Sequence, residues 1–410
     1  MKSAAVVPGA PGSEVAPGTG EASPPTRELS PLVAADSFVR TLPGMLTKHG
    51  AAPLARSLRP PRGVVVLYSR TDKLGVAPKE EILADLETIA IAEAVAQVLQ
   101  VRTDLKVHLV PALRHVETAL EPYPPEDYLV FNLFEGVDGV LPEDGNTVLE
   151  EEARAALTLE ALGYRYTGAD GRILALSVNK ACSKAALTQG GVLTPAWRVF
   201  GGIDAVTAVA LRGVCFPLIV KPVAEDSSLG IDSDAVVHDP TSLRARVALI
   251  TRLYGQPVLA EEFIDGREFN VGLWGNPPRV LPLAEVNLSA LGAPERRIVT
   301  YAAKWEEGTF EYQHTPVNCP ASVTEELASS IRDAAVRAWR AVGGHRGYGR
   351  VDMRVQEQRC YVLEVNPNPS IAVDAGFARA ARAAGLDYAD MVLTILSQAG
   401  EGIGAYNSTG

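Results

Sequence analysis

Apolar and polar positions follow two different periods along the chain from residue 63 onward. The short apolar runs Gly63–Tyr68 and Tyr128–Leu133 are typical of buried strands, whereas Glu80–Gln100 repeats its apolar residues at helical spacing. Strands that alternate with helices predict a parallel, wound α/β layer in this part of the chain. Further strands are predicted at Lys106–Val110, Ala196–Phe200, Phe216–Lys221, Val258–Phe263, Glu268–Trp274 and Val280–Val286.

The same spacing predicts an amphipathic helix at Thr324–Val342, followed by a strand pair near the C-terminal end. Between these elements lies a long irregular segment, Asn287–Asn318, of the kind that often forms a lid or a binding loop. The first sixty residues are rich in Ala, Pro, Gly and Ser, and we interpret residues 1–61 as a disordered or extended arm. Other helices are predicted at Asn146–Leu162, Ser177–Gln189, Thr241–Tyr254, Ala372–Gly385 and Asp387–Ala399.

Composition narrows the class of protein. The 410 residues are 47% hydrophobic and 21% charged, as in a globular protein with several domains. A net charge of −11 argues against a broad nucleic-acid surface but leaves room for a local basic pocket. The four cysteines are scattered and no apolar run could span a bilayer. We therefore expect a cytoplasmic protein with reduced thiols that binds neither nucleic acid nor membrane.

The most informative stretch is Gly349–Ile371, which contains two strand-like runs joined by a polar turn. Side chains two apart on a strand share a face, so Arg350 and Asp352 point together, as do Glu364 and Asn366. If the hairpin pairs, one face carries a guanidinium, two carboxylates and an amide, which suits magnesium–nucleotide chemistry. A solvent-facing sheet surface would show the same alternation, and the hairpin alone does not decide between these interpretations.

Three lysines are candidates for contacts with phosphate groups. Lys221 ends an apolar strand and precedes a small polar loop, 224–230, whose backbone could contact phosphates; it could equally pair with Glu225 or reach solvent. Lys180 begins a helix and Lys304 lies in the irregular segment, where surface lysines are common. Taken singly, none of the three identifies a site.

A fourth candidate segment is Glu261-Glu262-Phe263-Ile264, which joins two predicted strands. Free backbone groups in such a linker could recognise an adenine edge, and Glu268 on the next strand could accept from ribose hydroxyls. A solvated acidic edge strand would explain the same residues.

The order of these segments resembles the ATP-grasp fold, and in particular the D-alanine–D-alanine ligase branch. The resemblance covers roughly residues 128–399. It implies an α/β protein, α+β in its C-terminal half, with an N-terminal substrate domain at 62–175, a central lid domain at 176–266 and a catalytic domain at 267–400. Residues 401–410 would form a tail. The matching segments read VFNLFEG, GYRYTGAD, LSVNK, FPLIVKP, SSLG, VLAEEFIDGREFNV, GYGRVDMRV and YVLEVNPNP.

The resemblance also implies roles for individual residues. Magnesium ions would be coordinated by Asp352, Glu364 and Asn366, and Arg350 would stabilise the transferring phosphoryl group. Lys304 would reach the γ-phosphate from a closing loop. The remaining ATP contacts would come from Lys180, Lys221, Ser227, Ser228, Glu261, Glu262, Phe263, Ile264 and Glu268.

Both substrate pockets depart from the pattern of that branch. The glycine- and serine-rich run expected after the first strand is replaced by residues 68–75, and the tyrosine expected after the lid lysine is Trp305. The family's Pro-Gly-Met is replaced by residues 368–371, and Asp374 stands where a small residue would meet the acceptor carboxylate. The candidate substrate residues are Glu81, Glu135, Asn368 and Ser370.

These features predict an ATP-dependent carboxylate–amine ligase that acts on a small acid and an amine other than two D-alanines. The resemblance further implies ATP and Mg²⁺ as cofactors and a homodimer. Two other functions stay open: a cell-wall D-alanine–D-alanine ligase, and a nucleotide-binding interaction protein that has no ligase turnover. A pure scaffold would bind no ATP.

Overall fold

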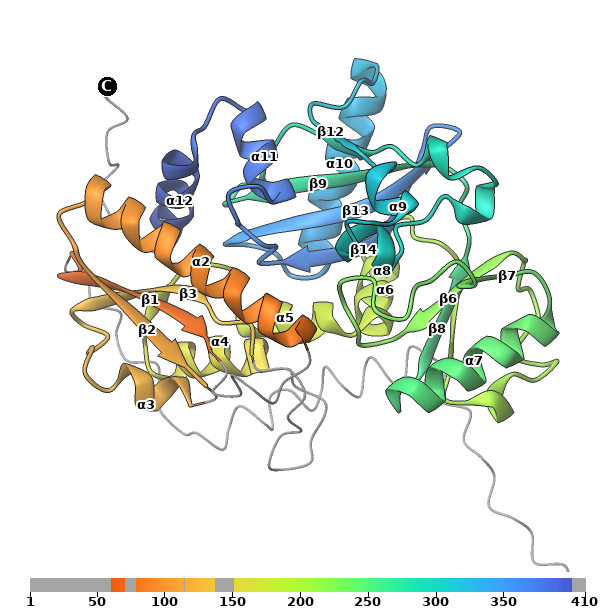
Figure 1. The fold of residues 1–410 in the computed structure, drawn as a ribbon, viewed down its shortest axis with the longest axis horizontal. Coiled ribbons are helices and arrows are strands. Elements are labelled where there is room, and N and C mark those ends of the chain that lie inside the picture. The colour runs from red at the N-terminus through yellow and green to blue at the C-terminus, as the bar shows by residue number, and fades with distance from the viewer. Residues whose placement is uncertain (1–59, 71–78, 114, 137–150, 400–410) are drawn as a thin grey trace, which may run out of the picture.

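The computed structural model describes residues 60–70, 79–113, 115–136 and 151–399, with side chains in helix α2 from Leu86 onward. These residues form three sheets with helices packed around them (Figure 1). The predicted N-terminal arm, except for its last two residues, and the predicted tail lie outside the described residues. Within the described residues, no helix is long and apolar enough to cross a membrane.

The first sheet is parallel, as the alternating pattern predicted. Its strands are β1 (Gly63–Ser69), β2 (Lys106–Ala112), β3 (Tyr128–Leu133) and β4 (Arg165–Tyr166), in the order β2-β1-β3-β4. Alternate residues of β1 face two different cores, so that both faces of the sheet are covered. One face packs against α2 (Lys79–Arg102), and the other against α3 (Val116–Leu120) and α4 (Glu151–Ala161).

The second sheet is antiparallel and has its own small core. Its strands β5 (Trp197–Phe200), β6 (Leu218–Pro222), β7 (Val236–Val237) and β8 (Val258–Glu262) run in the order β5-β8-β6-β7. Helix α7 (Pro240–Tyr254), which begins at an Asp239 capping box, covers one face, and the turn η1 (Ile203–Ala205) packs against this helix.

The helix predicted at residues 177–189 is wrong as a single element. The chain forms α5 (Gly171–Val178) and then α6 (Lys180–Gln189). Asn179 separates them because its side chain accepts hydrogen bonds from the N–H groups of Ala181 and Cys182, which caps α6.

The third sheet contains the predicted hairpin. Strands β9 (Arg267–Trp274), β11 (Ala284–Val286), β12 (Val317–Asn318), β13 (Tyr348–Gln356) and β14 (Arg359–Pro367) run in the order β12-β11-β9-β13-β14, and β10 (Arg279–Val280) pairs with β9. The strand predicted at 280–286 is thus two short strands, separated at Pro282, which has no N–H for a ladder. The irregular segment forms short turns of helix: η2 (Ser289–Leu291), η3 (Pro294–Arg296), α8 (Tyr301–Trp305) and α9 (Phe310–Gln313).

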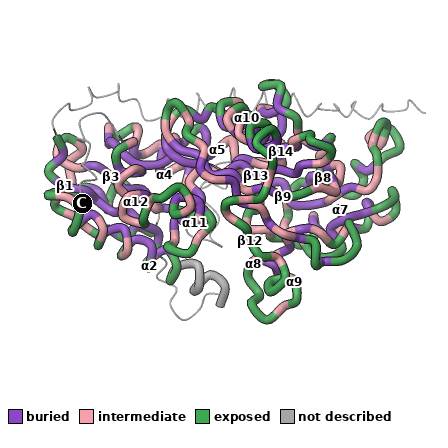
Figure 2. Tube along the Cα trace, turned by 90° about the horizontal axis from the view of Figure 1, so that it is seen from above, coloured by how far each residue is buried: buried purple, intermediate pink, exposed green. Residues whose placement is uncertain are grey.

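Helices from the C-terminal half join the first and third sheets through shared cores. Helix α10 (Glu325–Ala341) buries its predicted apolar face, including Trp339, in the core that contains β9, β13 and β14. Helices α11 (Gly376–Ala383) and α12 (Tyr388–Ser397) bury theirs with α2 and one face of the first sheet. Figure 2 shows this continuous buried interior along the strands. The two sheets are therefore held at a fixed separation.

Replacing Gly349 with Ala should destabilise the protein. A Cβ at Gly349 would lie 2.4 Å from the Trp339 ring, and Trp339 is fully buried. Overpacking of this kind costs about 1–3 kcal/mol of unfolding free energy, measurable by urea titration. The matched control is Gly376→Ala, where nothing lies within 4 Å of the new Cβ. Equal stability of the two variants would contradict the packing argument.

Candidate active site

The predicted hairpin forms, and its register brings the four candidate side chains together. On β13 and β14, Arg350 lies opposite Asn366 and Asp352 opposite Glu364, with a bulge immediately after Asp352. A bulge in antiparallel strands adds twist and re-aims the side chains beside it. The guanidinium, the amide and both carboxylates therefore share one face of the sheet, as the alternation predicted.

Asp352 accepts hydrogen bonds from three side chains on this face. Its side chain is almost fully buried, and both carboxylate oxygens accept hydrogen bonds from Arg350 at 2.8 Å. Asn366 donates to Asp352 at 2.9 Å and to Glu364 at 3.2 Å. Asn270 on β9 donates a further bond to Asp352 at 2.8 Å, a contact that the sequence analysis missed. Bidentate Arg–carboxylate pairing gives a rigid geometry, so Arg350 is held in place.

The three predicted lysines converge on Glu364. Partial burial by itself would raise the pKa of Glu364, but Lys180, Lys221, Lys304 and Arg350 together hold that pKa well below its usual range. An opposite charge shifts a carboxyl pKa strongly only at close range. The charges of four cations from separate elements therefore act on one carboxylate. Burial would lower the pKa of Arg350, but Asp352 and then Glu364 raise it, so the guanidinium stays charged.

Lys221 is buried and paired, which excludes the two alternatives of a partner in Glu225 and exposure to solvent. Its Nζ lies 2.6 Å from Glu261 Oε1, and Lys184 Nζ lies 2.6 Å from the other oxygen of the same carboxylate. The second contact is an ion pair, although its angle falls outside hydrogen-bond geometry. Burial opposes ionisation of Glu261, but the two lysines lower its pKa below the ordinary value. Lys184 also donates to Thr194 at 2.7 Å.

The small polar loop contacts the segment that carries Lys304. Ser227 and Ser228 adopt left-handed backbone conformations, with φ of 50° and 64°. The Ser228 hydroxyl donates to the Val299 carbonyl at 2.9 Å, and the Trp305 indole donates to the Ser227 carbonyl at 3.1 Å. Lys180 donates to the Glu225 carbonyl of the loop. Loop 224–230 is thus hydrogen-bonded both to Lys180 and to the segment that carries Lys304.

The two acidic side chains of the linker lie on opposite faces of the sheet. Glu261 faces the lysines, whereas Glu262 points to the other face and lines a second hollow with Trp197 and Cys215. Recognition of adenine by the backbone groups of the linker stays a prediction. The interpretation as a solvated edge strand is wrong, because β8 pairs on both sides.

The predicted ribose-binding carboxylate is held by an arginine that the sequence analysis missed. Glu268 is buried, and its Oε2 accepts from Arg354 at 2.7 and 3.0 Å. Arg354 also donates to the backbone carbonyls of Ile264 and Arg297, and the Phe263 ring lies beside its guanidinium. Arg354 therefore fixes the linker at Ile264, the carboxylate of Glu268 and the backbone at Arg297 relative to one another.

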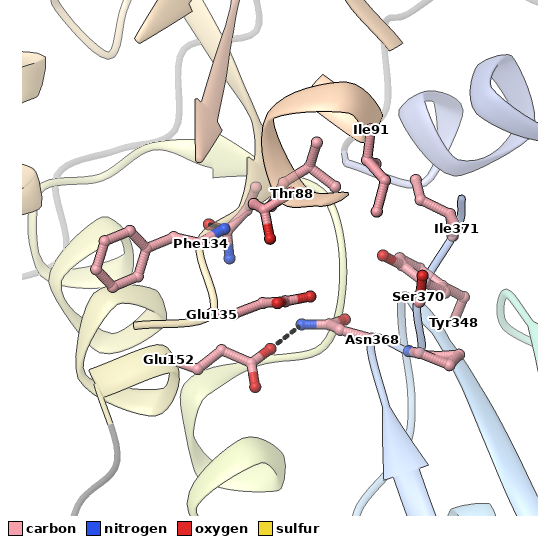
Figure 3. Close-up of a pocket in the computed structure, with 12 residues that line it drawn as sticks. Thr88, Ile91, Phe134, Glu135, Glu152, Tyr348, Asn368, Ser370 and Ile371 are labelled. Atoms are coloured by element: carbon pink, nitrogen blue, oxygen red, sulfur yellow. Dashed lines mark hydrogen bonds between the residues drawn. The ribbon is translucent and has the colours of Figure 1, made fainter. Parts of the chain in front are cut away.

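A cavity lies between the first sheet and the loop that follows β14 (Figure 3). Three of the four candidate substrate residues, Glu135, Asn368 and Ser370, line it. The fourth, Glu81, belongs to α2, but its side chain lies outside the described residues. Asn368 Nδ2 donates to Glu152 at 2.9 Å, and its Oδ1 accepts from the Ala169 N–H at 2.8 Å.

Comparison with known proteins identifies the family. Residues 202–397 match the family model described as D-ala D-ala ligase C-terminus. A D-alanine–D-alanine ligase of Desulforudis audaxviator is 34% identical over 246 residues, which span 60% of this chain and 76% of that protein. The chain belongs to the D-alanine–D-alanine ligase family. It is accordingly an ATP-dependent ligase with the ATP-grasp fold, as the sequence predicted.

Other relatives and a solved structure agree with this family. A D-alanine–D-alanine ligase of Bordetella petrii is 31% identical over 290 residues, 64% of this chain and 82% of that protein. The uncharacterized protein y4sG of Sinorhizobium fredii is 33% identical over 291 residues, 69% of this chain and 79% of that protein. The D-alanine–D-alanine ligase of Bacillus anthracis complexed with ATP shares the fold, with a TM-score of 0.61 at 19% identity, over 83% of this chain and 97% of that one.

Two of the missed residues carry a signal in the sequence of this ligase. Lys184 follows Lys180 by one helical turn, so both lie on one face of α6. Asn270 follows Glu268 by two positions on β9, so both lie on the same face of the sheet as Asp352. Arg354 has the same relation to Asp352, but its side chain bonds Glu268 and not the candidate metal ligands.

Replacing Lys184 with Met should destabilise the ligase by about 3 kcal/mol, because it removes one partner from a buried ion pair and leaves Glu261 under-compensated. Denaturant unfolding measures the loss. The double variant with Glu261→Gln should recover part of it, because the uncompensated carboxylate is then gone. Purely additive losses in the two variants would show that Lys184 and Glu261 are not coupled.

Proposed function

We propose that this ligase joins an amino acid, or a related small acid, to an amine through an acyl-phosphate intermediate, releasing ADP and phosphate. The observation that carries the proposal is the convergence of Lys180, Lys221, Lys304 and Arg350 on Glu364. Four cations beside two carboxylates fit a triphosphate with its metal ion, because each negative oxygen then meets an opposite charge.

The nucleotide contacts follow from the positions of these groups. Lys180 and Lys221 would hold the α- and β-phosphates under loop 224–230, and Lys304 would reach the γ-phosphate from α8. The linker 261–264 would contact the adenine, with the Glu262 side chain turned away. Glu268 would accept from the ribose through Oε1, since Arg354 bonds the other oxygen.

The hairpin fits magnesium by its donor set. Asp352 and Glu364 offer hard oxygen ligands side by side, and Asn366 would add its amide oxygen after turning its side chain around. A bound magnesium ion would neutralise charge on the phosphates and polarise them. Two carboxylates and an amide leave coordination positions for phosphate oxygens and water, as magnesium sites in such enzymes usually do.

The reaction needs two steps. A substrate carboxylate oxygen attacks the γ-phosphorus, the bond to the ADP oxygen breaks, and an acyl phosphate forms. The amine nitrogen then attacks the carbonyl carbon, phosphate leaves, and the nitrogen loses a proton. Arg350, fixed by Asp352, would stabilise negative charge in both steps. The contacts of loop 224–230 with Val299 and with Trp305 of α8 would exclude water from the acyl phosphate.

The substrate pair is proposed to differ from two D-alanines. Trp305 has no hydroxyl and uses its indole N–H to hold the loop, and Asn368 and Ser370 occupy the cavity wall. Asp374, just before α11, is exposed beside the expected acceptor position. A second candidate is D-alanine–D-alanine ligase, because several relatives carry that name.

ADP release with panels of acids and amines tests the proposal. We expect the highest rate with an acid–amine pair other than D-alanine alone, and a product mass equal to both substrates minus one water. Hydroxylamine supplied in place of the amine should give a hydroxamate, which reports the acyl phosphate. A rate that is highest with D-alanine alone would favour the second candidate.

Glu364→Gln should lower turnover by about 100-fold or more, the scale of losing one stabilising group at a reacting centre. It should also raise the magnesium concentration needed for half-maximal rate, because one charged ligand is lost. ADP release at several magnesium concentrations measures both effects. The control is Glu326→Gln, the same change at an exposed position of α10. Unchanged magnesium dependence in Glu364→Gln would remove Glu364 from the metal site.

A further inference from the structure

The guanidinium of Arg354 joins parts of the site that lie far apart in the sequence. On β13 this residue stands directly opposite Glu268 of β9, and it shares a face of the sheet with Asp352. Arg354 is 4% exposed. Its Nε and Nη2 donate to Glu268, its Nη1 donates to the Ile264 carbonyl at 3.0 Å, and its Nη2 also donates to the Arg297 carbonyl. The proposed phosphate and metal contacts do not involve Arg354.

The simplest explanation of these bonds is a buried arginine that satisfies its own charge. Glu268 alone supplies the opposite charge that burial requires. The two carbonyls add something else, because Ile264 belongs to the linker proposed to contact adenine, whereas Arg297 precedes the helix that carries Lys304. A guanidinium has five N–H donors in a fixed planar geometry, so its partners are held at fixed relative positions.

The chain from Arg297 to Lys304, here called the Lys304 segment, is held from two sides. At its start, the Arg297 carbonyl accepts from the guanidinium on the third sheet. Further along, the Val299 carbonyl accepts at 2.9 Å from Ser228, which lies in the loop after β6 of the second sheet. At its end, Lys304 brings the positive charge that helps to lower the pKa of Glu364. The position of the lysine therefore depends on both anchors.

We propose that Arg354 is a positioning residue that couples Glu268, the proposed ribose ligand, to Lys304, the proposed γ-phosphate ligand. The two oxygens of one carboxylate move together, so a ribose hydroxyl that bonds Oε1 also fixes Oε2 and the guanidinium bound to it. The guanidinium in turn fixes the Arg297 carbonyl, where the Lys304 segment begins. A nucleotide that carries its ribose hydroxyls therefore orders this segment better than one that lacks them. This inference rests on the nucleotide contacts proposed above.

Hydrogen exchange of the Lys304 segment tests the coupling without any turnover. The full-length protein is saturated with magnesium and either ATP or 2′,3′-dideoxy-ATP, with no acid or amine present, and calorimetric titration checks the saturation. We expect the backbone amides of the segment to exchange about fivefold or more slowly with ATP, the lower end of usual coupling between two sites. Equal exchange with the two saturating nucleotides would overturn the inference. This comparison uses the wild-type protein, so it holds even where a variant fails to fold.

Variants assign the effect to the guanidinium. Arg354→Met should abolish the difference between the two nucleotides, because the connection from Glu268 to Arg297 is then lost. Arg354→Lys keeps the positive charge without the planar fork and should restore part of the difference. An arginine that only stabilised the fold would leave the difference intact in any variant that folds. A difference that survives Arg354→Met would therefore overturn the assignment.

The matched control is Arg267→Met on the opposite face of β9. Arg267 makes the same kinds of bond, because it donates to Glu285 at 2.6 and 2.7 Å and to the Ser322 carbonyl at 2.8 Å. This variant should keep the full difference between ATP and 2′,3′-dideoxy-ATP. Loss of the difference in this control as well would show that Arg354 has no special role.

The same titration separates failure of this inference from failure of the proposed function. If ATP does not bind, the proposed nucleotide contacts are wrong, and the coupling through Arg354 is wrong with them. If ATP binds but no acid in the panel is turned over, only the proposed reaction fails. The exchange experiment then still decides whether Arg354 couples Glu268 to Lys304.

Discussion

The site depends on compensation between Glu364 and the four cations around it. Charges removed from water are costly unless each meets an opposite charge at short distance. Here Lys180, Lys221, Lys304 and Arg350 each lower the pKa of the same carboxyl group. The four residues come from α6, β6, α8 and β13, which belong to different layers of the fold. The charge cluster therefore constrains how the second and third sheets face each other.

The buried ion pairs of Glu261 with Lys184 and Lys221 support the charge cluster at Glu364. Lys221 takes part in both, because its ammonium contacts Glu261 and its charge also acts on Glu364. Lys184 supplies the extra positive charge that Glu261 needs, and it is anchored through Thr194 to the Val362 carbonyl on β14. Lys221, the proposed phosphate ligand, is thus positioned by the protein's own ion pairs. Such preorganisation reduces the reorganisation that the reacting centre must undergo.

Much of this site could be predicted from the sequence, because strand alternation is a local property. The placement of Arg350 with Asp352, and of Glu364 with Asn366, follows from spacing alone. The break between α5 and α6 could also have been predicted from the sequence, since Asn179 is a good helix cap. The partner of Lys184 could not, because it depends on how α6 packs on β8. Arg354 was missed for the same reason, since its carboxylate lies on another strand.

The substrate side of the fold can change while the nucleotide side is kept, because different elements build them. The cations and the proposed metal ligands lie on strands and helices, several of which are joined by buried ion pairs. The cavity is lined largely by side chains at the end of β3 and in the loop after β14. Asn368 is the link: its φ is 47°, and a Cβ at Gly168 would lie 2.6 Å from its Oδ1. A glycine at 168 therefore lets the loop dock closely. The cavity is thus held in a fixed position relative to β14, the strand that carries the proposed metal ligands Glu364 and Asn366.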